Sequence, residues 1–121
     1  MKGKKNLRKS FVDAGRGIFA GLYSERNMHI HLTAAVVALA ASFYFKIDKI
    51  ELLLVITAIF FVFVAEMFNT SVEAVIDLHT KNPHPLARTA KNVAAGAVLL
   101  AAIYSLLVAY FVFAERIRGL W

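Results

Sequence analysis

The sequence contains no cysteine, two prolines and comparatively few charged residues. Without cysteine there is no disulfide framework, no thiolate metal site and no thiol nucleophile. Charged residues make up 18% of the chain, below the roughly 25% of a typical soluble domain. The sequence also lacks a Gly-rich phosphate-binding loop, so a bound nucleotide would need other ligands. These shortages argue against a secreted disulfide scaffold, a cysteine enzyme and a P-loop enzyme.

Hydrophobic residues make up 60% of the chain, above the roughly 45–50% of soluble domains. This composition indicates a protein whose solvent is lipid. The 121 residues suffice for one domain, which we expect to cover 1–121. The net charge of +6 is compatible with nucleic-acid binding. However, the basic residues flank apolar stretches, where they are typical of a membrane orientation signal. We therefore expect no nucleic-acid partner.

Three apolar stretches are predicted to span a bilayer as helices, at about 28–45, 52–77 and 93–114. The second is free of charge only through Ala65, and its first 14 residues cover about 21 Å as a helix. It must therefore continue to Asp77 to cross a hydrocarbon core of about 30 Å. The two prolines then end it and begin a predicted loop over 78–92.

A fourth helix is predicted over residues 10–25, before the first span. Phe11, Ala14, Ile18 and Leu22 recur at three- and four-residue steps, which places them on one helical face. An amphipathic helix behind a basic tail is typical of a membrane surface. The alternative is a helix that covers a soluble core. The predicted fold is thus an all-α membrane protein, with an N-terminal amphipathic surface helix and three transmembrane helices.

The distribution of lysine and arginine predicts the orientation. With three spans, the N-terminal tail and the 78–92 loop lie on the same side of the membrane. That side carries ten basic residues: Lys2, Lys4, Lys5, Arg8, Lys9, Arg16, Arg26, Lys81, Arg88 and Lys91. The other side carries four: Lys46, Lys49, Arg116 and Arg118. The positive-inside rule therefore places the N-terminus and the 78–92 loop in the cytoplasm, with the chain in the cell membrane.

An acidic stripe lies within the second span. Glu66, Asn69, Glu73 and Asp77 are spaced by three, four and four residues, which places them within about 80° of one another on a helix. Acids in a spanning helix are costly and usually functional. The alternative is a stripe that only packs helices together through hydrogen bonds. Because the stripe runs from the acyl region toward cytoplasmic water, it can reach both a lipid headgroup and a soluble nucleotide.

Two more charged residues, Glu25 and Lys91, are expected on the same cytoplasmic side. Carboxylates with a nearby lysine suit a divalent cation that carries nucleotide phosphates. Taken singly, Glu25 and Lys91 are also compatible with ordinary interfacial charges.

The segment EMFNTSVEAVIDLHTKNPHPLARTAKNVAAGAVLL resembles the small bacterial diacylglycerol kinase and undecaprenol kinase family. The shared pattern is Glu-x-x-Asn-(Ser/Thr)-x-x-Glu-x-x-x-Asp, a short loop, and Ala-Lys-Asp ahead of small residues. Upstream, AGRGIFAGLYSERN looks like the family's surface helix and the turn into the first span. The His84-Pro85-Leu86-Ala87 loop is similar to that of the Gram-positive branch. The resemblance covers almost the whole chain.

The resemblance implies a homotrimer with active sites shared between subunits, and transfer of the ATP γ-phosphoryl group to a lipid hydroxyl with Mg²⁺. It implies that Glu66 is the general base, that Glu25 and Glu73 hold the metal, and that Lys91 contacts phosphates. The implied ATP-binding residues are Lys9, Arg16, Glu25, Glu73, Asp77, Asn82, Pro83, His84, Lys91 and Asn92. The implied supporting or substrate-contacting residues are Asn69, Thr70 and Ala95.

One position departs from the family pattern, because Asn92 stands where the family usually has aspartate. Asparagine has nearly the size of aspartate and keeps an acceptor oxygen, but it carries no charge. Because size and acceptor are kept, we expect a competent kinase. Undecaprenol is the preferred substrate and diacylglycerol the alternative, since both present a hydroxyl on an apolar body. The rival functions are a small oligomeric proton- or ion-coupled transporter and a structural membrane subunit. A transporter would want its acids near the midplane.

Overall fold

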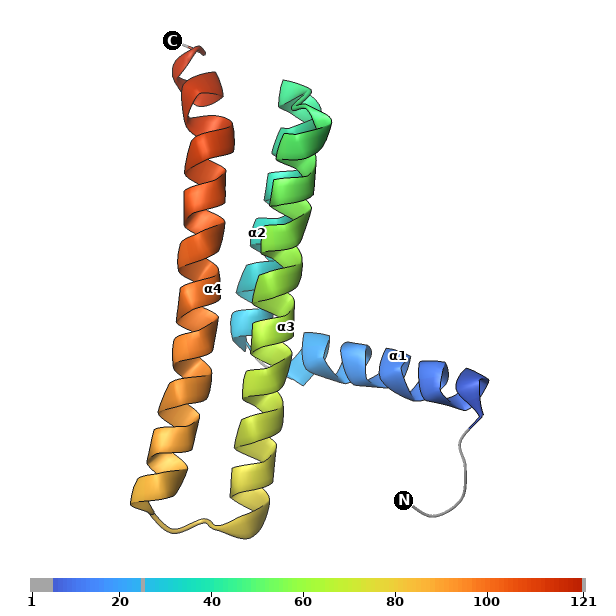
Figure 1. Cartoon of the computed structure of the whole chain (residues 1–121), viewed down its shortest axis with the longest axis vertical. Helices are drawn as coiled ribbons and strands as arrows, with labels where there is room; N and C mark the ends of the chain where they lie inside the picture. The colour runs from blue at the N-terminus through green and yellow to red at the C-terminus, as the bar shows by residue number, and fades with distance from the viewer. Residues whose placement is uncertain (1–5, 25, 121) are drawn as a thin grey trace.

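The computed structural model describes residues 6–24 and 26–120, which form four helices without a strand. The helices are α1 (Leu7–Ser24), α2 (Arg26–Phe45), α3 (Lys49–His79) and α4 (Pro85–Arg118). Figure 1 shows α2, α3 and α4 running alongside one another, with α1 projecting sideways from the middle of α3. The predicted all-α fold, with one separate N-terminal helix and three long ones, is confirmed.

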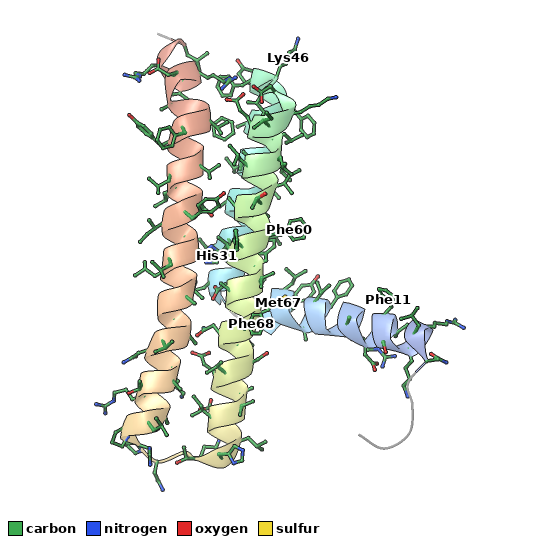
Figure 2. The ribbon with its side chains drawn as sticks, in the orientation of Figure 1. Phe11, His31, Lys46, Phe60, Met67 and Phe68 are labelled. Atoms are coloured by element: carbon green, nitrogen blue, oxygen red, sulfur yellow. The ribbon has the colours of Figure 1, made fainter. Side chains whose placement is uncertain are left out.

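Three helices of the described residues are long and apolar enough to cross a bilayer: Asn27–Phe45, Lys49–His79 and Pro85–Arg118. Their outer faces carry large apolar side chains. Phe60, Leu106 and Phe111 expose 64%, 70% and 77% of their surface, and Figure 2 shows Phe60 directed away from α4. Such a surface is unfavourable in water and suits hydrocarbon, while the helices satisfy their own backbone groups.

The buried core lies between α3 and α4, in the half of the helices away from the turn that joins them. Val55 and Ala58 of α3 pack there with Val108, Val112 and Phe113 of α4. Small side chains let helix backbones approach closely, which favours helix association in lipid. This packing holds α3 and α4 as a hairpin.

The α2–α3 turn is fixed by its local sequence. Lys46 adopts a left-handed backbone conformation with φ of 53°, which reverses the chain within a short link. Asp48 then caps α3: its side chain accepts the Glu51 backbone N–H at 2.8 Å, and the Glu51 side chain accepts the Asp48 N–H at 3.1 Å. This reciprocal capping box sets the start of α3.

The α3–α4 turn is shorter than the predicted 78–92 loop, because α3 ends at His79 and α4 begins at Pro85. Proline at the first helical position costs no hydrogen bond, so Pro85 starts a helix as well as preventing the previous one from continuing. His84 caps α4, with its Nδ1 accepting the Leu86 backbone N–H at 3.1 Å. Lys91 and Asn92 therefore lie within α4 rather than at its start.

Helix α1 docks on α3 through a glycine. Gly21 is buried, and a Cβ at this position would lie 3.1 Å from the Met67 Cγ. Figure 2 shows Met67 where α1 meets α3. Farther along α1, Phe11, Ile18 and Phe19 are 70%, 50% and 63% exposed, as expected for an amphipathic helix whose apolar face meets lipid.

Candidate active site

The acidic stripe forms on α3 and becomes steadily more exposed along the helix. Glu66 is buried, with 3% of its side chain exposed, and Asn69 is also buried. Glu73 is half-buried, and the Asp77 side chain is 53% exposed. The stripe thus connects the interior of the helix group with the aqueous end of the α3–α4 hairpin.

The buried end of the stripe contacts α2. His31 Nε2 lies 3.4 Å from Glu66 Oε2, and the His31 side chain is 22% exposed. Figure 2 shows His31 on α2, behind the α3–α4 hairpin and near its mid-height. A buried carboxylate is costly unless it is paired or hydrogen-bonded, and the imidazole supplies such a neighbour.

An apolar groove of about 310 Å³ is lined in part by His31. It lies between α2, α3 and α4, and alanines line much of it. The lining residues are His31, Ala34, Ala35, Ala38, Val55, Ala58, Ile59, Val62, Phe63, Ala102, Ser105, Leu106, Val108, Ala109 and Phe113. His31 therefore belongs both to the groove and to the contact with Glu66. The groove can accept an apolar chain.

A polar hollow of about 440 Å³ lies at the other end of the stripe, around the α3–α4 turn. Its lining residues are Ile76, Asp77, Thr80, Lys81, Asn82, Pro83, His84, Ala87, Arg88, Lys91 and Asn92. Across it, Lys91 Nζ donates a hydrogen bond of 2.9 Å to Asp77 Oδ1. With three basic side chains, the hollow attracts anions such as phosphate groups.

The turn residues of the hollow are held by local hydrogen bonds. The Asn82 backbone N–H donates to Thr80 Oγ1 at 3.2 Å, and the Thr80 hydroxyl donates to the Asn82 carbonyl at 3.1 Å. Together with the His84 cap, these bonds order the short chain between α3 and α4. Order in an exposed turn lowers the entropic cost of binding a ligand there.

The structure brings together six of the ten residues expected to bind ATP, all in the polar hollow: Asp77, Asn82, Pro83, His84, Lys91 and Asn92. Glu73 lies one helical turn from Asp77 on the same face of α3. Lys9 and Arg16 lie on α1 and are not among the residues that line the hollow. Glu25 lies outside the described residues.

Of the three expected supporting residues, two lie beside the acidic stripe and one does not. Asn69 and Thr70 lie on α3 beside the acidic stripe, and the buried Asn69 Oδ1 has no hydrogen-bond partner within residues 6–24 and 26–120. Ala95 is exposed on α4 and does not line the apolar groove.

Comparison with known proteins decides the family. Residues 13–113 match the model of the family described as prokaryotic diacylglycerol kinase. The chain belongs to this family. Undecaprenol kinase of Bacillus subtilis is 38% identical over 109 residues, which cover 90% of this chain and 89% of the relative. Diacylglycerol kinase of Synechocystis is 36% identical, with 85% and 59% covered, and that of Escherichia coli K12 is 27% identical, with 76% and 75% covered.

Membership in this family makes the chain an ATP-using lipid kinase of the membrane, as the sequence predicted. The polar hollow and the buried acid agree with this activity, because a lipid kinase must hold a soluble nucleotide and a membrane alcohol at one site. The transporter and structural-subunit hypotheses are set aside.

The stripe carries carboxylate oxygens, the donor atoms that Mg²⁺ prefers. Within residues 6–24 and 26–120, no group of three acidic or histidine side chains surrounds a single point. Mg²⁺ on a nucleotide needs fewer protein ligands, since waters and phosphate oxygens complete its octahedron. Glu73 offers oxygen ligands of the preferred kind between the buried acid and the polar hollow.

Sequence reasoning missed His31 as a site residue. His29 and His31 both lie near the start of α2. The signal that distinguishes the two is helical phase, because residues two apart on a helix point to nearly opposite faces. His31 turns toward α3 and contacts Glu66, while His29 is exposed and pairs edge-on with the Tyr23 ring at 6.5 Å.

Proposed function

We propose that this lipid kinase transfers the ATP γ-phosphoryl group to the hydroxyl of undecaprenol, with Glu66 as general base. The observation that carries the proposal is the acidic stripe, which runs from Glu66, in contact with the groove residue His31, to the polar hollow at Asp77. A kinase that joins a membrane alcohol to a soluble nucleotide needs this arrangement of one apolar and one polar binding region.

The spacing along α3 suits an extended nucleotide. At 1.5 Å per residue, Glu73 lies about 10 Å and Asp77 about 16 Å along the helix from Glu66. The nucleotide binds in the polar hollow, with Lys91 on its phosphates, and its triphosphate runs along α3 toward Glu66. The lipid hydroxyl approaches Glu66 from the apolar groove. Both substrates then meet at the buried end of the stripe.

In the transfer step, the lipid oxygen forms a bond to the γ-phosphorus while its proton passes to the Glu66 carboxylate. The bond between the γ-phosphorus and the β–γ bridging oxygen breaks, and ADP leaves with that electron pair. Such transfers depend mostly on positioning and on stabilising the charge of the phosphoryl oxygens. Lys91 supplies positive charge, and the helices exclude water from the Glu66 end.

Glu73 and Glu25 are the residues we assign to Mg²⁺. The bound cation supplies charge neutralisation on the phosphate oxygens. Glu73 is suitably placed between the two ends of the stripe, and Glu25 is assigned from the family resemblance.

Two features favour undecaprenol over diacylglycerol. The relative named undecaprenol kinase matches 90% of this chain at 38% identity. In addition, the apolar groove beside His31 has alanines of all three long helices in its lining and suits one slender chain. Undecaprenol has a single isoprenoid chain, whereas diacylglycerol carries two acyl chains. This groove does not include Ala95, which the family resemblance implied as a supporting or substrate-contacting residue.

We further propose that the N-terminus and the polar hollow face the cytoplasm and that three copies share their active sites. The ten basic residues on the hollow's side, against four on the other, support this orientation. Helix α1 meets α3 at Met67, so an α1 lying on the membrane surface places Glu66 at the interface and the hollow beyond it, in water (Figure 1).

Competition between the two lipids tests the substrate assignment. Undecaprenol and diacylglycerol, at equal mole fraction in the same micelles, are offered to the purified kinase with labelled ATP. We expect phosphorylated undecaprenol to dominate. A ratio that favours diacylglycerol would overturn the substrate assignment and leave the kinase activity standing.

A variant tests the base assignment. Glu66→Gln should lose most phosphoryl transfer, about 100-fold or more, while still binding nucleotide. Wild-type turnover in this variant would refute the base assignment.

A further inference from the structure

The contact between His31 and Glu66 joins α2 to the next helix along the chain, α3. His31 Nε2 is 3.4 Å from Glu66 Oε2, slightly beyond the usual N–H···O range of roughly 2.7–3.2 Å. Catalytic hydrogen bonds are often long without substrate and tighten in the complex. The contact is therefore close enough to become a hydrogen bond after a small adjustment of either side chain.

We infer that His31 is a positioning residue for Glu66, an inference that rests on the proposed role of Glu66 as the base. In the tautomer that carries its proton on Nε2, the imidazole donates to Oε2 and fixes the plane of the carboxylate. Fixing one oxygen also fixes the direction of the other, which must meet the lipid hydroxyl. Orientation of this kind strongly affects rate, since a misplacement of about 1 Å can cost about 100-fold.

The surroundings of His31 support this role over simple packing. Its side chain is 22% exposed and belongs to the apolar groove proposed for the lipid chain. A polar ring in such a lining is unfavourable unless it has a partner, and Glu66 is that partner. His31 thus lies between the groove proposed for the lipid chain and the proposed base, Glu66. It orients Glu66 and is not itself the proton acceptor.

His31→Phe and His31→Gln separate hydrogen bonding from shape. Phenylalanine keeps a ring but loses the donor, so kcat should fall about 10- to 100-fold while the KM for ATP stays near wild type. Glutamine offers an amide N–H at a similar reach and should restore most of kcat. A residue that only lined the groove would instead raise the lipid KM and leave kcat unchanged. His29→Gln is the matched control on the exposed face of α2 and should behave as wild type.

His31→Ala provides a second test if the phenylalanine variant does not fold, as judged by circular dichroism and gel filtration. Because His31 lines a groove, added imidazole can occupy the vacated space and should recover part of the lost kcat. The inference is overturned if His31→Phe keeps wild-type kcat, or if neither glutamine nor imidazole restores activity. If Glu66→Gln loses activity while His31→Phe keeps the wild-type kcat, only the proposed role of His31 is refuted. Full activity in Glu66→Gln would refute the proposed base itself.

Discussion

Arg116 of α4 holds Glu51 of α3 with a two-pronged salt bridge at the end of the helices farthest from the α3–α4 turn. Its Nη1 and Nη2 donate hydrogen bonds of 2.8 Å to Glu51 Oε2 and Oε1. Nη1 also donates to the Val112 carbonyl at 2.7 Å. The paired geometry matches the planar fork of the guanidinium and is more specific than a single contact.

Breaking this salt bridge should affect stability and not catalysis. Glu51→Gln and Arg116→Lys each lose the paired geometry, so the melting temperature in detergent should fall by a few degrees. The kinase rate at saturating substrates should stay unchanged, since the pair lies far from Glu66. Glu115→Gln is the control, because Glu115 pairs with Arg118 on the same exposed helical end. An equal loss of stability in that control would contradict a specific role for the Glu51–Arg116 pair.

The close approach of Gly21 to Met67 predicts a second effect. In Gly21→Leu the new side chain must push α1 away from α3, next to Glu66, and kcat should fall about tenfold. Gly21→Ala should be milder, because the flexible Met67 side chain can move. Met67→Ala should partly rescue the leucine variant. Gly15→Leu is the control, since a Cβ there meets nothing within 4 Å. Equal losses at both glycines would contradict a docking role for Gly21.

The acidic stripe could be predicted from the sequence because it depends on helical period alone. Residues at steps of three, four and four lie on one face of any regular helix, so the shared face of Glu66 and Asp77 needed no tertiary information. The gathering of Asp77, Asn82 and Lys91 was expected from the family resemblance but not from local pattern, because the predicted 78–92 loop is longer than the turn between α3 and α4.

The remaining features depend on how separate helices pack, which no local pattern contains. His31 meets Glu66 because of the way α2 packs against α3. The apolar groove arises from three helices together and lies away from the expected Ala95 region. Lys9 and Arg16, which the resemblance implied as ATP-binding residues, lie on α1 outside the hollow, because α1 docks near Met67 rather than at the α3–α4 turn.

Loss of the assigned metal ligands should weaken magnesium dependence specifically. Glu73→Ala removes a carboxylate ligand, so the Mg²⁺ concentration for half-maximal rate should rise about 10- to 100-fold. Glu25→Ala should act likewise. Titration of the rate with Mg²⁺ at fixed ATP measures both effects, and Mn²⁺ binding followed by electron paramagnetic resonance measures them without turnover. An unchanged metal dependence in both variants would rule out this pair as ligands.

The Lys91–Asp77 pair predicts a defect in nucleotide binding. Lys91→Met removes a positive charge from the polar hollow, and the KM for ATP should rise about tenfold or more while the lipid KM stays unchanged. Lys91→Arg keeps the charge with altered geometry and should be intermediate. Lys49→Met, at the opposite end of α3, serves as the control. A rise in the lipid KM alone would show that Lys91 acts on the other substrate.

Asn92 gives the last prediction, because the family pattern has aspartate at this position. Asn92 lines the polar hollow beside Lys81, Arg88 and Lys91. In Asn92→Asp the added carboxylate meets three basic groups, which favours its ionised form, and it supplies a further oxygen ligand for a nucleotide-bound cation. We expect kcat/KM for ATP to rise a few-fold at low Mg²⁺ and to converge with wild type at saturating Mg²⁺.

Two further variants at this position separate charge from hydrogen bonding. Asn92→Ala loses the acceptor oxygen and should fall below wild type at every Mg²⁺ concentration. Asn92→Gln keeps an amide but displaces it by one methylene, and it should lie between alanine and wild type. If Asn92→Asp is slower than wild type at low Mg²⁺, the carboxylate competes with phosphate for the basic residues instead of assisting the metal. The native asparagine would then be the better ligand for this hollow.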